Sequence, residues 1–390
     1  MKKEKDTFPF MALLAFAMTG FICIMTETIP AGLLPEISAA MNMSLSGAGQ
    51  WVTVYALGAL FTAIPLTIAT RAWKRKYILQ TTVAGFLVFN TVTALSSNVY
   101  LTLFARFGAG AAAGLAWSLL AGYSRRIVAA HLQGRAMAIA MAGTPVALSL
   151  GGPLGTWFGH FVGWRLTFGA MSGLSVLLMM WIHLAVPNLP GQLKHEKIPF
   201  RNVLATPGVR PVLAVVLTWM LAHNMLYTYI APFTALSGMG SHVDAILLIF
   251  GLAALAGLIF TGKVIDRHLR RMVLLSLAGF SVVSLFLGLF AYTPAILIAG
   301  CAVWGLTFGG AATLLNTALA DAAGEGADVA ISMTVVSWNA AIALGGIVGG
   351  LILKGADVSR LPWALLILVI CSLLIVKNNN KYAFPFRVQV

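Results

Sequence analysis

The sequence predicts an all-α polytopic membrane protein whose twelve transmembrane helices form two pseudo-symmetric six-helix halves. Three observations lead to this fold class. Of the 390 residues, 59% are hydrophobic and only 9% are charged, whereas a soluble protein carries about 25% charged residues. Apolar runs of about 20 residues, the length that crosses a hydrocarbon layer, recur along the whole chain. A weak internal repeat relates the first half to the second.

The first half, residues 1–186, is predicted to hold six spans. The apolar run after MKKEKDTFPF is too long for a signal peptide and lacks a small-residue cleavage site, so we expect it to remain as the first helix. Turn residues and charges separate the later runs. The predicted spans lie near residues 9–29, 50–70, 77–96, 99–122, 135–157 and 165–186.

A polar, proline-bearing and basic segment, PNLPGQLKHEKIPFRNVLATPGVR, interrupts the apolar pattern at residues 187–210. We predict a cytoplasmic linker there, followed by a second six-helix half over residues 211–377 and a cytoplasmic tail over residues 378–390. The spans of the second half are expected near residues 211–233, 243–262, 272–291, 294–318, 329–352 and 361–377.

The basic residues predict the orientation of these spans, because cytoplasmic loops carry an excess of Lys and Arg. With both termini in the cytoplasm, only Lys354 and Arg360 fall clearly outside, while Arg165 lies near an outer boundary. This distribution explains the net charge of +14 without a nucleic-acid partner. The inner loops then hold Lys2, Lys3, Lys5, Arg71, Lys74, Arg75, Lys76, Arg125, Arg126, Arg135, Lys194, Lys197, Arg201, Arg210, Lys263, Arg267, Arg270, Arg271, Lys377, Lys381 and Arg387.

The repeat appears when the halves are aligned at an offset of about 195 residues. A duplicated six-helix unit places the substrate path between the halves, near the middle of the bilayer. The clearest matches are LSLGGPLG (148–155) with IALGGIVG (342–349), Gly110 with Gly305, and Gly114 with Gly309.

The loop GKVIDRHLRRMVL (262–274) is similar to the signature loop of the major facilitator superfamily, although Leu269 replaces its usual second glycine. The whole chain resembles the twelve-span drug:proton antiporters of that family. The resemblance implies that the acid and bases of this loop pair with neighbouring helix ends and hold the cytoplasmic side shut. Simple charge anchoring is the alternative. The implied gating residues are Asp266, Arg267, Arg270 and Arg271.

The fifth predicted span contains GTPVALSLGGPLG, which resembles the glycine-rich antiporter signature, although Thr156 stands where a further glycine is common. Small residues provide a smooth, kinkable surface on which another helix can rock, but they also serve plain helix packing. The residues given this gating role are Gly143, Gly151, Gly152, Pro153 and Gly155.

Arg106 and Glu27 are charged residues inside predicted spans. An arginine in hydrocarbon normally faces the bundle interior and pairs with an acid or with carbonyl groups, and the antiporters are similar in carrying one there; snorkelling to the outer interface is the alternative. Glu27, in FICIMTETIPAGLLPEIS, is the only acid well within a predicted span, at a depth that Arg106 can match. The residues after it resemble bacterial sugar- and nucleoside-efflux members of the family.

From these positions we predict a proton site. Glu27 would be protonated from the outside and would release its proton toward the cytoplasm as substrate is exported, with Arg106 adjusting the balance between its two states. A structural acid paired with the arginine is the alternative.

The repeat carries Glu27 to the neighbourhood of His223, which shares a helix face with Tyr227 and lies beside Asn224. A histidine titrates near neutrality, so His223 is predicted to join the proton relay or to bind substrate; a hydrogen-bonded core residue is the alternative. The remaining candidates for the substrate cavity are Tyr55, Trp117, Asn316, Trp338 and Asn339.

The sequence contains no Walker-type phosphate loop and no His/Cys metal cluster, and Cys23, Cys301 and Cys371 all lie in apolar runs. We therefore expect neither an enzyme nor a cofactor, but a monomeric transporter driven by an ion gradient. The resemblance to the drug:proton antiporters implies that the ion is the proton and that the membrane is a bacterial inner membrane. Its partners would be a small-molecule substrate, protons and the lipid bilayer. The predicted function is proton-coupled export of drugs, sugars or nucleosides by alternating access; uptake or facilitated diffusion, and a transport-inactive receptor, are the alternatives.

Overall fold

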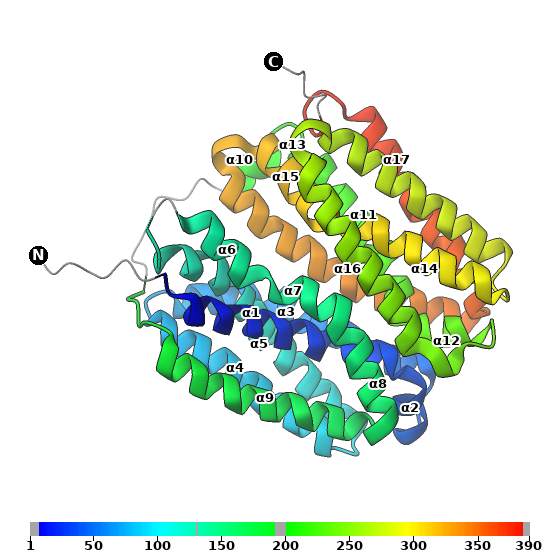
Figure 1. The fold of residues 1–390 in the computed structure, drawn as a ribbon, viewed down its shortest axis with the longest axis horizontal. Coiled ribbons are helices and arrows are strands. Elements are labelled where there is room, and N and C mark those ends of the chain that lie inside the picture. The colour runs from blue at the N-terminus through cyan, green and yellow to red at the C-terminus, as the bar shows by residue number, and fades with distance from the viewer. Residues whose placement is uncertain (1–7, 130–131, 192–199, 385–390) are drawn as a thin grey trace, which may run out of the picture.

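The computed structural model describes residues 8–129, 132–191 and 200–384. Within these residues the secondary structure is helical, without a strand (Figure 1). Twelve segments of the described chain are long and apolar enough to cross a membrane, which confirms the predicted number of spans.

The first half has a discontinuous fifth span. Pro145 and Pro153 lack the N–H groups that would continue the α-helical ladder, and the backbone between them widens into a π-helical turn. The helices of this half are α1 (Phe10–Gly32), α2 (Leu34–Ala40), α3 (Leu45–Thr70), α4 (Arg75–Leu95), α5 (Val99–Arg126), α6 (Gln133–Met141), α7 (Gly143–Val146), η2 (Ala147–Gly151), α8 (Gly152–Val162) and α9 (Trp164–Ala185).

The second half departs from the predicted spans at two helix breaks. Pro232 cannot donate to the Thr228 carbonyl, so the seventh span ends at Thr228 and a short helix follows. The tenth span breaks at Gly309 and Gly310. The elements are α10 (Phe200–Ala205), α11 (Val209–Thr228), α12 (Ile230–Ala235), η3 (Gly240–His242), α13 (Val243–Leu289), α14 (Pro294–Phe308), α15 (Ala311–Ala323), η4 (Gly324–Gly326), α16 (Ala327–Gly355), η5 (Val358–Arg360) and α17 (Leu361–Asn378).

Helix α13 contains the eighth and ninth spans together. The prediction separates them, and the backbone marks the boundary at His268, whose φ of −133° and ψ of 29° are not helical. The chain therefore passes from the eighth span to the ninth through a kink at His268.

Glycine contacts show the pseudo-symmetry of the halves in atomic detail. In the first half, Gly110 of α5 lies so close to α3 that a methyl group there would collide with the Tyr55 carbonyl. Its repeat partner Gly305 of α14 lies in the same way against the Phe250 carbonyl of α13. The predicted duplicated unit is thus confirmed as one packing arrangement used twice.

The halves contact each other mainly through α3 with α16, and through η2 and α8 with α13 (Figure 1). We call the end of the bundle that carries α2 and α12 the outer end, since the prediction places it outside. There α2 also contacts α12, whereas the main contacts of α6 and α15, at the opposite end, are within their own halves. The structure is therefore closed at its outer end.

Candidate functional site

Glu27 lies in α1 and has the only buried carboxylate among the described residues, with 9% of its surface exposed. The polar side chains beside it have partners of their own. Thr28 donates to the Ile24 carbonyl at 2.8 Å, and Asn90 of α4 donates to the Thr26 hydroxyl at 3.0 Å. Neither threonine therefore depends on Glu27 for its hydrogen bond.

Arg106 of α5 is completely buried, which excludes the snorkelling alternative. Its Nε donates to the Trp51 carbonyl at 3.3 Å, but Nη1 and Nη2 have no hydrogen-bond partner. The guanidinium lies over the rings of Tyr55 and Phe168, at 5.0 and 5.4 Å from their centroids. Aromatic faces stabilise such a cation only in part, so a buried positive charge remains available to an anion.

Glu27 and Arg106 interact electrostatically without forming an ion pair of 4.0 Å or less. Tyr55 connects them, because its ring lies under the guanidinium and its hydroxyl donates to the Cys23 carbonyl, one turn before Glu27, at 2.9 Å. This buried tyrosine holds α3 against α1, so the structure places a predicted substrate residue between the two residues of the predicted proton site.

His223 of α11 lies in an aromatic cluster of the second half. Its ring stacks on Phe308 with centroids 3.5 Å apart, and Trp304 and Phe250 lie at 5.3 and 5.8 Å. Its buried Nδ1 has no hydrogen-bond partner. The Nδ1 atom of His223 is thus an unsatisfied polar atom among aromatic rings, which differs from the alternative of a hydrogen-bonded core residue.

Tyr227 links the two clusters. Its ring centroid is 5.6 Å from that of His223, and it interacts electrostatically with Glu27 of the first half. A methyl group at Gly152 would lie only 2.8 Å from the hydroxyl oxygen of Tyr227. The structure therefore places the cluster of Glu27, Arg106 and Tyr55 next to the cluster of Tyr227 and His223.

The other predicted substrate residues lie in varied environments. The amide nitrogens of Asn224 and Asn339 donate to carbonyls of their own helices, those of Met220 and Val335. The Oδ1 atom of Asn316 is buried without a partner. Trp117 packs near Gly20 of α1, and Trp338 packs on a small cluster where α3 meets α16.

The predicted inner gate has one buried member among its described side chains. Arg270 donates from Nη1 to the Val376 carbonyl at 2.8 Å and from Nη2 to the Lys377 carbonyl at 3.2 Å, at the end of α17. Arg267 and Arg271 are exposed. Asp266 lies in α13, and its side chain is outside the described part of the structure. The described contacts of Arg270 thus join two helices of the same half.

The glycine-rich fifth span approaches α1 and α11. A methyl group at Gly143 would collide with the Ala17 carbonyl, and one at Gly155 would lie 2.8 Å from Met25 Cε. Pro153, beside Gly152, is at the start of α8 and is buried. These contacts, the π-helical turn included, let the fifth span lie directly against the helix that carries Glu27.

Sequence reasoning missed Phe250, Trp304 and Phe308, the rings that surround His223. Aromatic residues in apolar runs carry no sign of a site until the helices are placed. The repeat contained one usable signal, since Phe250 is the counterpart of Tyr55. Among the described residues, no group of three His, Cys, Asp or Glu side chains is arranged to hold a metal ion.

Comparison with known proteins gave consistent matches. The family model described as Major Facilitator Superfamily matches residues 16–346 and, again, residues 245–377. A probable sugar efflux transporter of Helicobacter pylori (strain P12) is 25% identical over 354 residues, 90% of each chain. A purine ribonucleoside efflux pump of Escherichia coli (strain K12) is 29% identical over 349 residues, 86% of each chain. The crystal structure of a D-xylose-proton symporter has a TM-score of 0.79 at 14% identity and covers 97% of this chain and 99% of its own, a likeness of fold.

Proposed function

This chain belongs to the Major Facilitator Superfamily and is a membrane transporter, not an enzyme, and we propose that it exports a small polar solute in exchange for protons. The solute would be of the sugar or nucleoside class, which is what the names of the two efflux relatives state for those proteins. The transporter would act as a monomer in a bacterial inner membrane, with both termini in the cytoplasm.

The observation that carries the proposal is the arrangement of Glu27 and Arg106. A buried carboxylate is stabilised as the neutral acid by its apolar surroundings and as the anion by a nearby cation, so small movements decide which form prevails. Arg106 has two unpartnered nitrogens and no ion pair with Glu27 in this closed-outside structure. The pair is therefore arranged to gain or lose a proton when the helices around it shift.

Substrate and proton would be coupled through Tyr227, because it contacts the aromatic cluster of His223 and interacts electrostatically with Glu27. A solute that enters between the halves from the cytoplasm would meet the rings and the free Nδ1 atom of His223 first. Sugar and nucleoside rings bind well to flat aromatic faces with a few hydrogen-bonding groups. Binding there would move Tyr227 and favour release of the proton from Glu27.

The test is a screen in inside-out membrane vesicles, in which the cytoplasmic side of the transporter faces the medium. Purine nucleosides and small sugars are added one at a time, and the pH of the weakly buffered medium is recorded. We expect proton release into the medium upon addition of a transported solute, and none from vesicles that contain Glu27→Gln. Release that is equal in both preparations would contradict the assignment of Glu27.

A further inference from the structure

We propose that Gln50, Tyr229 and Gly350 form an outer latch, a contact that keeps the outer end of the transporter closed while the cytoplasmic end is open. None of these residues belongs to the inner gate or the substrate candidates described above. The inference uses the alternating access of a transporter of this family but does not depend on proton coupling or on the identity of the solute.

Two hydrogen bonds converge on one carbonyl group in the outer latch. The Gly346 carbonyl of α16 accepts from the Tyr229 hydroxyl at 2.7 Å and from Gln50 Nε2 at 3.2 Å. Gln50 belongs to α3 in the first half, whereas Tyr229 and Gly346 belong to the second half. The hydrogen bond from Gln50 therefore crosses between the halves. The hydrogen bond from Tyr229 lies within the second half and holds the region of α16 that carries the accepting carbonyl group.

Glycines make this contact possible by letting the backbones approach. A methyl group at Gly350 would lie 2.7 Å from Ser46 Oγ, 2.8 Å from the Tyr229 hydroxyl and 3.0 Å from Gln50 Nε2. A methyl group at Gly49 of α3 would lie 2.6 Å from the ring of Tyr229. Most of these separations are shorter than real carbon contacts, so a methyl group at Gly350 would displace the side chains of Ser46, Tyr229 and Gln50 that make the contact.

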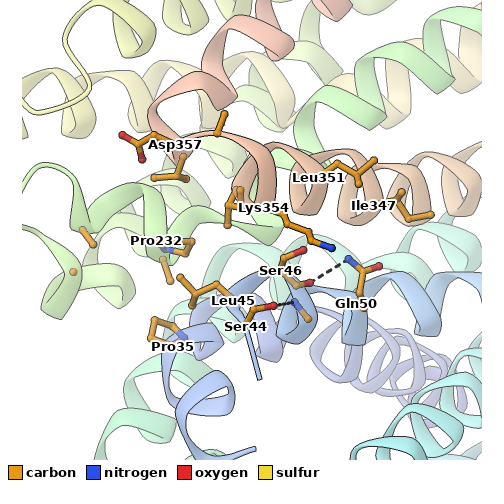
Figure 2. A pocket seen from close by; sticks show the side chains of 17 residues that line it. Pro35, Ser44, Leu45, Ser46, Gln50, Pro232, Ile347, Leu351, Lys354 and Asp357 are labelled. Carbon is orange, nitrogen blue, oxygen red and sulfur yellow. Dashed lines mark hydrogen bonds between the residues drawn. The ribbon is translucent and has the colours of Figure 1, made fainter. Parts of the chain in front are cut away.

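A pocket of about 1100 Å³ lies on the outside of the latch and is lined by both halves (Figure 2). Gln50 lines it together with Ser46 and Lys354, and Figure 2 shows the Lys354 side chain directed toward these two residues. Thr53, one turn deeper on α3, is only 2% exposed, and a methyl group at Gly346 would collide with its hydroxyl. The latch thus lies between a pocket on its outer side and the buried contact of Thr53 on α3 with Gly346 on α16.

This boundary provides an assay. Thr53→Cys places a thiol of similar size just inside the latch. Cys371→Ser removes the exposed native thiol, while Cys23 and Cys301 are buried. The rate at which a membrane-impermeant maleimide added from the outside labels residue 53 then reports opening of the outer end, with no need for substrate or a proton gradient.

In this background we expect Gln50→Ala and Tyr229→Phe each to raise the labelling rate by about two- to tenfold, for the loss of one hydrogen bond. Gly350→Ala should also raise it, because the added methyl group displaces Gln50 and Tyr229. Gly355→Ala in the same helix, where a methyl group meets nothing within 4 Å, and Tyr292→Phe, whose ring is exposed, should leave the rate unchanged. The background protein without Thr53→Cys measures labelling of the buried cysteines.

Unchanged or slower labelling in the three latch variants would overturn the proposal. Gln50→Ala decides the matter if Gly350→Ala does not fold, because it removes the hydrogen bond that crosses between the halves. A positive result stands even if Glu27→Gln leaves proton release unaltered, so failure of the latch and failure of proton coupling are distinguishable.

Discussion

At the scale of single residues, charge is confined to one half of the site. Arg106 and Glu27 lie in the first half, whereas their repeat counterparts in the second half are the buried and uncharged Cys301 and Ala222. The sequence could single out the two charged residues, because an ionisable group inside an apolar run is costly and therefore conspicuous. It could not reveal that Arg106 has two unpartnered nitrogens, since that depends on where six helices place their carbonyl groups.

Arg106→Met tests the role of this buried charge. Methionine is shorter than arginine but flexible, comparable in volume and uncharged, and replacing buried ionic groups by apolar residues of similar volume is often neutral or stabilising. We expect an unfolding temperature in detergent equal to or above that of the native protein, together with a loss of pH-gradient-driven export of at least about tenfold.

Arg106→Lys is the matched control, because it keeps the charge at nearly the same depth and should retain part of the driven export. A large fall in the unfolding temperature of Arg106→Met, with driven export preserved in the folded fraction, would mean that the arginine is structural.

At the scale of helices, the sequence predicted which glycines are equivalent in the two halves, but it did not predict every position at which a helix breaks. The repeat predicted that Gly110 and Gly305 are equivalent, and both lie against a carbonyl group of a neighbouring helix. The breaks at Thr228 and at Gly309 were not predicted, because apolar runs continue across them and hydropathy alone cannot show where a backbone hydrogen bond is lost.

Gly110→Ala and Gly305→Ala should destabilise the protein to a similar extent, by about 1 to 3 kcal/mol each, since a methyl group would force apart tightly packed helices. Gly169→Ala is the control, because a methyl group there meets nothing within 4 Å and alanine favours a helix. Unfolding by sodium dodecyl sulfate, monitored by tryptophan fluorescence, measures all three. Equal stability of Gly110→Ala and Gly169→Ala would contradict the packing that the structure shows.

At the scale of the whole molecule, the number of spans and the two-half architecture followed from composition, spacing and repeat, because the bilayer imposes a length and a hydropathy on each span. The sequence did not predict which end of the transporter is closed, because the same twelve helices can form arrangements closed at either end. These arrangements differ in the contacts between the halves. In this structure α2 contacts α12 at the outer end, whereas the main contacts of α6 and α15 at the opposite end are within their own halves.

The central claim is that Glu27 carries the transported proton, and Glu27→Gln in proteoliposomes tests it most directly. The variant mimics the protonated acid permanently, and because solute binding and protonation of Glu27 oppose each other in this mechanism, it should bind labelled solute at least about fivefold more weakly than the native protein. The same proteoliposomes should show no accumulation of solute against its gradient when a pH gradient is imposed. Accumulation driven by the pH gradient at the native level would contradict the account.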